Sequence, residues 1–263
     1  MNHRLHLALY VTLLTLFALA PVRAQTTFNK AFSSASGAKK VTLIVEDVDL
    51  HIEGYAGNEV RIEGEGYEGP PERAAGLRPL YNNASDNTGL GLQVDESNNE
   101  ITIRKASHQS LGYRIQVPRE ANVSIEERGW TGGDFQLRNL TGEIEIASNG
   151  ADILLDAVSG PVVASTTSGD IDVIFAGLNQ EMPSSISNVS GHIDVQVPAT
   201  AKASFDLSSV SGEIYTNLDL LMPEEKEGLH RVGGRKVQGT YNGGGVEISL
   251  RAISDNIYLR KAE

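Results

Sequence analysis

The sequence reads TGEIEI at residues 141–146, TSGDIDVIF at 167–175, VSGHIDVQV at 189–197 and VSGEIY at 210–215. In each copy a glycine precedes one polar residue and then a run in which apolar and polar residues alternate. The glycines of the last three copies are 22 and 21 residues apart. A period of this size indicates a repeat architecture in which each copy is one structural unit.

Glycines also recur every 8 to 10 residues between positions 133 and 169, and each interval holds one short alternating stretch. Such alternation places one face of a strand on a core and the other in water. Short strands cannot bury that face alone, so coils of two strands must stack on one another. We therefore expect an all-β fold, a β-solenoid with coils of about 19–22 residues and glycine-marked turns. In it, Ile171, Ile193 and Ile214 should form one apolar column.

Strands are also predicted on either side of these repeats. Alternating apolar residues occur at 39–62, 90–94, 101–104, 113–117, 246–250 and 257–259. The second and third of these stretches, with Ser97-Asn98-Asn99 between them, predict a hairpin. The last two are expected to close the stack, with Arg260 and Lys261 on its exposed final edge. Residues 222–229 are the one helical candidate, because Pro223 suits a first helical turn.

Residues 64–89 interrupt the pattern. They are rich in glycine and proline and show no apolar period, and so long a loop inside a domain is either functional or irregular. We expect residues 39–263 to form a single β-solenoid domain with an irregular insertion at about 64–89. Residues 25–38 are expected to be an N-terminal lead-in.

Residues 1–24 have the features of a secretory signal peptide. Arg4 gives a basic start, residues 7–20 are apolar, and Val22-Arg23-Ala24 is a small-x-small cleavage sequence. The apolar stretch is shorter than the roughly 20 residues that cross a bilayer. We therefore expect cleavage after Ala24 and export to the periplasm or the cell exterior, with no integral membrane segment left after cleavage.

The chain after this cleavage site is strongly acidic. Residues 25–263 contain 20 basic and 34 acidic residues, a net charge of −14. Such a surface repels phosphate backbones and anionic lipids, which argues against nucleic acid as a partner and against peripheral membrane binding. The sequence has no cysteine, which excludes disulfides and thiol catalysis. The core alone must therefore hold the fold.

Several phrases, taken together and in order, resemble one family. They are the VSG-polar-Ile repeats, NTGLGL at 87–92, YRIQVP at 113–118, VSGPVVASTTSGDI at 158–171 and GGGVEISLRAISDNIYLRK at 243–261. They resemble a bacterial putative-adhesin family of β-strand repeat proteins, a domain of unknown function related to GIN-type head domains. The resemblance covers about residues 39–260. It implies a right-handed β-helical or β-roll-like, adhesin-like domain that is exported from a bacterial cell, and it brings no catalytic residues.

Acidic residues recur at fixed places in the repeats. Glu143, Asp170 and Glu213 each follow a repeat glycine, and stacked coils could align them into a ladder that binds calcium. The calcium-binding β-roll phrase is absent, and His192 replaces one acid, so solvated outward positions are expected instead. No HExxH, HxH or GxSxG spacing occurs. We expect no metal, no cofactor and no catalytic residue.

Aromatic residues are the candidates for contact with a ligand. Five of them could form a stacking surface for a glycan or a peptide, or could simply be isolated rings: Trp130, Tyr113, Tyr215, Tyr241 and Tyr258. Contact is expected first where the repeat is broken, at Tyr67 and Tyr81 in the insertion and at Trp130.

These observations predict an exported, non-enzymatic β-repeat protein, an adhesin or another envelope-associated binding protein. Its expected partner is an unknown protein or glycan at the cell envelope. Two alternatives stay open. One is a carbohydrate-active enzyme on a β-helix scaffold, which needs carboxylates at a defined separation in a groove. The other is a structural or sensory component of the cell envelope.

Overall fold

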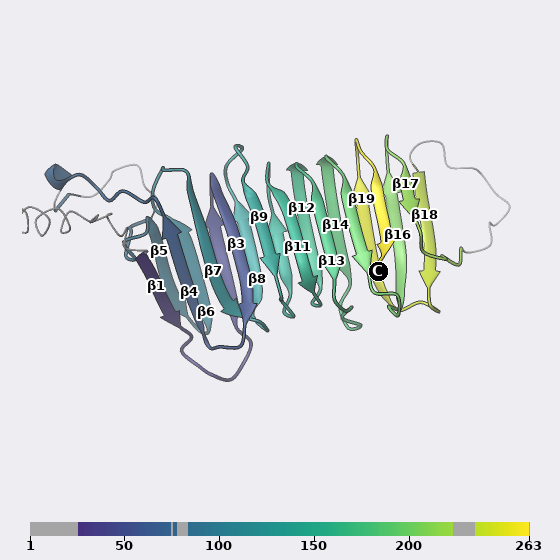
Figure 1. Cartoon of the computed structure of the whole chain (residues 1–263), viewed down its shortest axis with the longest axis horizontal. Coiled ribbons are helices and arrows are strands. Elements are labelled where there is room, and N and C mark those ends of the chain that lie inside the picture. Colours follow the sequence, from purple (N-terminus) through teal and green to yellow (C-terminus); the bar gives the residue numbers. More distant parts are fainter. Residues whose placement is uncertain (1–25, 75, 78–83, 223–234, 263) are drawn as a thin grey trace, which may run out of the picture.

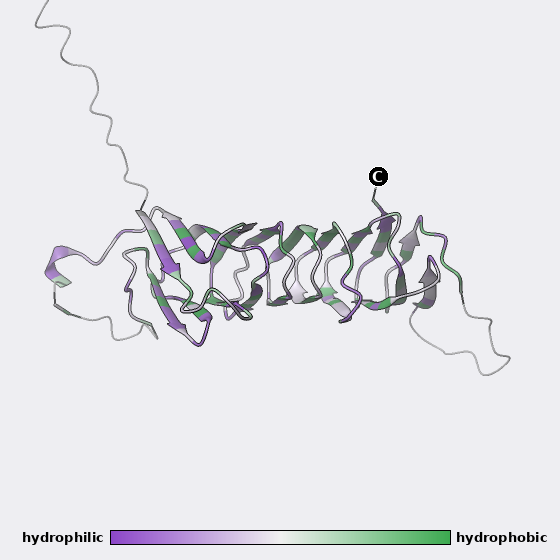
Figure 2. Ribbon diagram, turned by 90° about the horizontal axis from the view of Figure 1, so that it is seen from below, coloured by the Kyte–Doolittle hydropathy of each residue, from purple (hydrophilic) through white to green (hydrophobic). Residues whose placement is uncertain are grey.

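The computed structural model describes residues 26–74, 76–77, 84–222 and 235–262. Within these residues the protein is all-β, with the 3-10 turn η1 (Glu72–Ala74) as its helical part. The strands form two ten-stranded sheets that run along an elongated body (Figure 1). Figure 2 shows the same body at right angles, with the two sheets as two layers. No helix in the described part of the chain is long and apolar enough to cross a membrane.

The two sheets are named here sheet A and sheet B. Sheet A contains, in spatial order, β1 (Thr26–Ala31), β4 (Glu59–Glu65), β7 (Leu111–Pro118), β3 (Val48–Tyr55), β9 (Asp134–Arg138), β11 (Asp152–Val158), β13 (Ile171–Phe175), β15 (Ile193–Val197), β20 (Ile257–Lys261) and β17 (Ile214–Thr216). Sheet B contains β18 (Arg235–Tyr241), β16 (Ala203–Ser209), β19 (Val246–Ala252), β14 (Ser184–Ser190), β12 (Val162–Ser168), β10 (Ile144–Ala147), β8 (Asn122–Glu127), β2 (Lys40–Val45), β6 (Glu100–Lys105) and β5 (Leu92–Ser97). Both sheets are mixed. Their interiors are parallel, and the antiparallel pairs among the described strands lie near the ends, at β1, β4, β5 and β18.

Successive strands from β8 to β15 alternate between the two sheets. Each then pairs in parallel with the strand two places along the chain, as β11 does with β13 and β13 with β15. The register places Ile153 opposite Ile171 and Ile171 opposite Ile193, so neighbouring units are offset by 18 and then 22 residues. The alternating pattern of the sequence is thus the pattern of strands that face a common interior.

Apolar columns fill the space between the sheets. Ile171 faces Ile193 and Val173 faces Val195, and all four side chains are fully buried. Burial of one such side chain contributes about 1.5–3 kcal/mol. Repeated over the length of both sheets, these columns stabilise a chain that has no disulfide.

The predicted order of strands at the C-terminal end is wrong. Ile214 does not stand next to Ile193, because Ile257 of β20 lies between them and pairs with both. In sheet B, β19 likewise lies between β14 and β16. After the turn that follows β18, the chain runs back toward the middle of the molecule, where β19 completes sheet B and β20 completes sheet A. Arg260 and Lys261 therefore lie inside sheet A and not on a final edge.

The N-terminal part differs from prediction in one respect and agrees in another. The expected lead-in contains β1, which forms the edge of sheet A and runs antiparallel to β4. The predicted hairpin is present as β5 and β6, and Asn98 and Asn99 adopt φ values of 53° and 65° at its turn. The predicted signal peptide and residues 223–229 of the helical candidate lie outside the described residues.

The repeat glycines lie where the backbones of neighbouring coils touch. Gly191 has a φ of 114°, and a Cβ there would overlap the carbonyl oxygen of Gly169. Gly169 has a φ of 134°, and a Cβ there would overlap the carbonyl oxygen of Ala151. At these positions glycine is required both by backbone conformation and by space.

Candidate functional site

The outer face of sheet A carries two rows of side chains, called here the outer rows. The strand register aligns Glu63, Arg114, His51, Gln136, Leu154, Asp172, Asp194, Tyr258 and Tyr215 in the first row. It aligns Arg61, Gln116, Glu53, Arg138, Asp156, Ile174, Gln196 and Arg260 in the second. Adjacent strands are about 4.8 Å apart, so neighbouring side chains within a row can interact.

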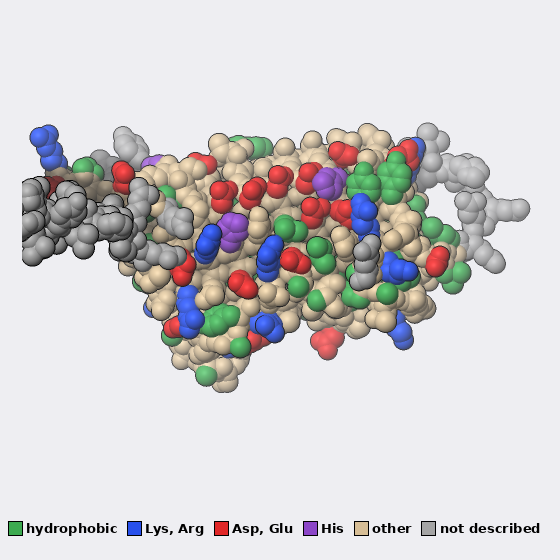
Figure 3. All heavy atoms as spheres, in the orientation of Figure 1, with side chains coloured by type: hydrophobic (Ala, Val, Ile, Leu, Met, Phe, Trp, Pro, Cys, Tyr) green, Lys and Arg blue, Asp and Glu red, His purple; other side chains and the backbone are tan. Residues whose placement is uncertain are grey.

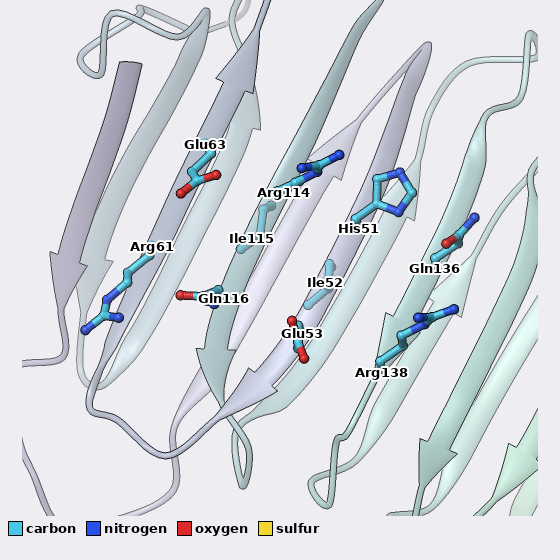
Figure 4. A pocket seen from close by; sticks show the side chains of 10 residues that line it. All are labelled: His51, Ile52, Glu53, Arg61, Glu63, Arg114, Ile115, Gln116, Gln136 and Arg138. Carbon is cyan, nitrogen blue, oxygen red and sulfur yellow. The ribbon is translucent and has the colours of Figure 1, made fainter. Parts of the chain in front are cut away.

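A hollow of about 330 Å³ lies at the N-terminal end of the outer rows, over β4, β7, β3 and β9 (Figure 4). We call it the polar hollow. Its lining consists of His51, Ile52, Glu53, Arg61, Glu63, Arg114, Ile115, Gln116, Gln136 and Arg138. Ile52 and Ile115 are only 1% exposed, so the accessible lining is made of charged and amide groups. The hollow therefore offers many hydrogen-bond donors and acceptors on a rigid sheet.

Two cations of the polar hollow are held by neighbouring groups. The Nε of Arg61 donates to Oε1 of Glu59 at 2.7 Å, and its guanidinium lies 4.7 Å from the centre of the Tyr55 ring. The hydrogen bond to Glu59 raises the pKa of Arg61. Arg138 faces Asp156, with 3.6 Å between Nε and Oδ2. These guanidinium groups are thus oriented before any ligand arrives.

Arg114 and His51 are the other two basic residues of the hollow. They are direct neighbours on β7 and β3, and both side chains are exposed. Neither forms an ion pair with any residue that the structure describes. In Figure 4 the guanidinium of Arg114 points toward His51 and away from Glu63. Their donors are therefore open to solvent.

An aromatic cluster occupies the C-terminal end of the outer rows. The rings of Tyr215 and Tyr258 stack with centroids 5.4 Å apart and an interplanar angle of 12°. His192 meets Tyr258 edge-on at 6.1 Å. The Nε of Arg260 lies 2.8 and 2.9 Å from the two carboxylate oxygens of Asp194, and its guanidinium lies over Tyr258. Two of the five aromatic candidates from the sequence are thus brought together.

The other three aromatic candidates lie elsewhere. Tyr113 is buried and its hydroxyl donates to the carbonyl of Leu90 at 2.8 Å, and burial raises its pKa. Tyr241 is also buried and donates to the carbonyl of Ala199 at 3.1 Å. Trp130 is 78% exposed in the turn between β8 and β9. A single stacking surface made of all five rings does not exist.

The residues predicted to contact a ligand are Tyr67, Tyr81 and Trp130, and Tyr67 differs from Trp130 in burial and in position. Burial and a hydrogen bond to Asp86 raise the pKa of Tyr67, whose ring packs on the core. Tyr67 therefore helps to hold the insertion against the body. Tyr81 lies outside the described residues. Trp130 is accessible at its turn, and a contact role for these residues stays a prediction.

Of the recurring acidic residues, Glu143 precedes β10 of sheet B, whereas Asp170 and Glu213 lie where β13 and β17 begin, at the face formed by sheet A. Figure 3 shows acidic side chains in a row along this face. Oδ1 of Asp152 accepts the backbone N–H of Asp170 at 2.9 Å, and Oδ1 of Asp170 accepts that of His192 at 2.8 Å. Asp152 and Asp170 thus connect one coil to the next while remaining at the surface, a role that the sequence alone does not reveal. No group of three or more His, Asp or Glu side chains in the described ranges could hold a metal ion.

Two carboxylate pairs of the outer rows can be compared with the carboxylate pair of a glycosidase. Asp172 and Asp194 are neighbours, but His192 lies 3.1 Å from Asp172 and Arg260 binds Asp194. In the polar hollow, Glu53 and Glu63 are separated by β7. Their offset of two strands and two residues puts their Cα atoms about 12 Å apart. Glycosidase carboxyl groups lie about 5–9.5 Å apart, and in the Asp172–Asp194 pair both carboxylates already have a basic partner.

Sequence reasoning missed the pairing of His51 with Arg114. The two residues are 63 positions apart in the sequence. Both occupy polar positions of alternating strands, which indicates that they face outward. Only the register of β3 against β7 makes them neighbours, and that register is not visible in either strand alone.

Comparison with known proteins gives a family and two structures. Residues 131–260 match the family described as Toastrack DUF4097, which confirms the resemblance to β-strand repeat proteins of unknown function. A "putative cell adhesion protein" from Clostridium sporogenes ATCC 15579 is 14% identical, with a TM-score of 0.49 over 90% of this chain and 100% of that one. A "putative adhesin" from Bacteroides fragilis NCTC 9343 is 12% identical, with a TM-score of 0.39 over 92% and 99%. No curated protein matches the sequence.

Proposed function

We propose that this chain, whose residues 131–260 match the Toastrack DUF4097 family, is an exported, non-enzymatic β-solenoid that binds a partner at the cell envelope. The observation that carries the proposal is the outer face of sheet A. It presents the polar hollow at one end and the Tyr215–Tyr258 stack at the other, on strands whose backbones are already paired. Such a rigid, accessible face suits an interaction surface.

The solenoid interpretation rests on the strand pairing. Consecutive strands alternate between the sheets and pair in parallel with the next unit, as in a right-handed β-helix or a β-roll. In this interpretation residues 39–263 are one domain, and β1 adds an outer strand to it. Export to the periplasm or the cell exterior rests on the signal-peptide features of residues 1–24.

Binding is favoured over catalysis by the state of the carboxylates. Asp172 and Asp194 are engaged by His192 and Arg260, and Glu53 and Glu63 stand on strands that β7 separates. The partner we propose is a glycan or a protein of the envelope. Trp130, exposed at the rim where sheet B passes into sheet A, is a second contact point in this proposal.

The chain allows a direct test because it contains no cysteine. Gln136→Cys would place one thiol in the polar hollow, and Ser185→Cys would place one on the outer face of sheet B. Each thiol is coupled to a bulky polyethylene glycol maleimide. Binding of the protein to envelope fractions of its source bacterium, separated into polysaccharide and protein, is then measured.

Polymer on Gln136→Cys should abolish binding, because it covers the outer face of sheet A. The same polymer on Ser185→Cys should leave binding unchanged. Equal loss from both variants, or from neither, would contradict the assignment of this face. Hydrolysis of any envelope polysaccharide by the unmodified protein would contradict the non-enzymatic part of the proposal.

A further inference from the structure

The polar hollow has a surplus of basic side chains on an otherwise acidic chain. It contains three arginines and one histidine against two glutamates, whereas the whole chain has 22 basic and 34 acidic residues. Arg61 and Arg138 have carboxylate partners at 2.7 and 3.6 Å, but Arg114 and His51 have none among the described residues. The surplus is therefore concentrated at Arg114 and His51.

These two side chains are placed to share one anionic group. They face each other across β7 and β3, and Arg114 extends toward His51 (Figure 4). Two basic groups directly opposite each other repel when both are charged, and an anion between them removes that repulsion. A guanidinium also offers a planar fork of donors that matches a carboxylate.

The surroundings of this pair favour a ligand rich in hydroxyl groups. Gln136 stands next to His51, and Gln116 and Glu53 face each other in the second row. These groups provide both donors and acceptors, as hydroxyl groups require. Such a ligand would lie across the strands and meet both rows.

A peptide fits the hollow less well. Strands β7, β3 and β9 are paired on both sides, so no free edge remains for an added strand. Ile52 and Ile115 are buried, so the hollow offers no apolar pocket for a peptide side chain. Recognition must therefore come from polar side chains alone.

We infer that the polar hollow binds an acidic sugar, with its carboxylate between Arg114 and His51 and its hydroxyl groups on Gln116, Gln136 and Glu53. This inference rests on the proposed binding function and names the chemistry of its ligand. It concerns a single sugar unit, because a volume of about 330 Å³ is at the lower end for ligand sites.

The test compares glucuronate with glucose, which differ only in the carboxylate. Titrations into the purified, isotope-labelled protein at low ionic strength are followed through the NMR signals of the His51 ring and of the hollow backbone. We expect glucuronate to bind about tenfold more tightly than glucose, a difference of about 1.4 kcal/mol. Acetate and a glutamate-rich peptide are titrated as further probes.

Two variants locate the effect. Arg114→Gln should reduce the preference for glucuronate to about twofold or less, because it removes the fork but keeps a polar side chain. Arg251→Gln makes the same change at an exposed position of β19, in sheet B, and should keep the full preference. Unfolding curves of both variants check that the fold is intact.

Three results would overturn the inference. One is equal binding of glucose and glucuronate, or no binding of either. Another is binding of acetate or of the acidic peptide as tight as that of glucuronate. The third is that Arg114→Gln and Arg251→Gln change the preference for glucuronate over glucose by the same factor. If the protein fails these titrations but still captures an envelope component in a polymer-sensitive way, only the acidic-sugar assignment fails and the proposed function stands.

Discussion

Two glycines of this chain illustrate how differently the same residue type is used. A Cβ on Gly191 would overlap the carbonyl oxygen of Gly169 in the neighbouring coil, at a φ of 114°. We expect Gly191→Ala to lower the free energy of unfolding by about 3 kcal/mol or more. Gly112 of β7 has open space around its Cβ position. Gly112→Ala should leave stability unchanged or raise it by up to about 1 kcal/mol. Urea unfolding measures both free energies. An equal loss of unfolding free energy in the two variants would contradict the close contact between the backbones at Gly191 and Gly169.

Asp86 holds the segment that returns from the insertion to the body. Its Oδ1 accepts the backbone N–H groups of Thr88 and Gly89 at 2.9 Å, and its Oδ2 accepts that of Gly91 at 3.1 Å. Burial opposes ionisation of this carboxyl, but the hydrogen bonds from Thr88, Gly91 and Tyr67 outweigh burial and lower its pKa. The charged form of Asp86 is therefore part of the folded structure.

Asp86→Asn should cost about 1 kcal/mol of unfolding free energy at pH 7, a modest loss because solvent also reaches this carboxylate. A carboxyl whose pKa is lower in the folded state stabilises the protein above its unfolded-state pKa, about 3.9. That stability is lost as the pH falls through the folded-state pKa. The difference in the free energy of unfolding between wild type and Asp86→Asn should therefore become smaller from pH 7 toward pH 3, as measured by urea unfolding. Asp219→Asn, an exposed control, should leave stability unchanged throughout, and a constant gap for Asp86→Asn would contradict its role.

At the scale of the element, most strands could be predicted from residue patterns. Alternation predicted that Ile171 and Ile193 share one buried column, and the structure places them in register, as it does Val173 and Val195. The hairpin of β5 and β6 followed from its Asn-rich turn. These features are local, because they depend on strand period and turn conformation within a few residues.

The position of β20 could not be predicted in the same way. Its alternation at Ile257 and Leu259 is identical in kind to that of the repeats, and nothing in it specifies which strands it joins. Its place between β15 and β17 belongs to the assembled sheets, in which β19 and β20 each lie between strands that come earlier in the chain. The His51–Arg114 pair was hidden for the same reason, since register between distant strands is a property of the assembled sheet.

At the scale of the whole molecule, the last strand joins the C-terminal end to the rest. β20 pairs with β15 on one side and β17 on the other, so its removal exposes two strand edges inside sheet A. We expect deletion of residues 254–263 to lower the midpoint of thermal unfolding sharply and to cause association on size-exclusion chromatography, because unpaired edges recruit other chains. Deletion of residues 26–31 removes β1, an edge strand with one neighbour, and should leave a monomer with a much smaller loss. If both truncated proteins show the same unfolding midpoint and the same elution, β20 does not hold the C-terminal strands to the rest of sheet A, and the prediction is wrong.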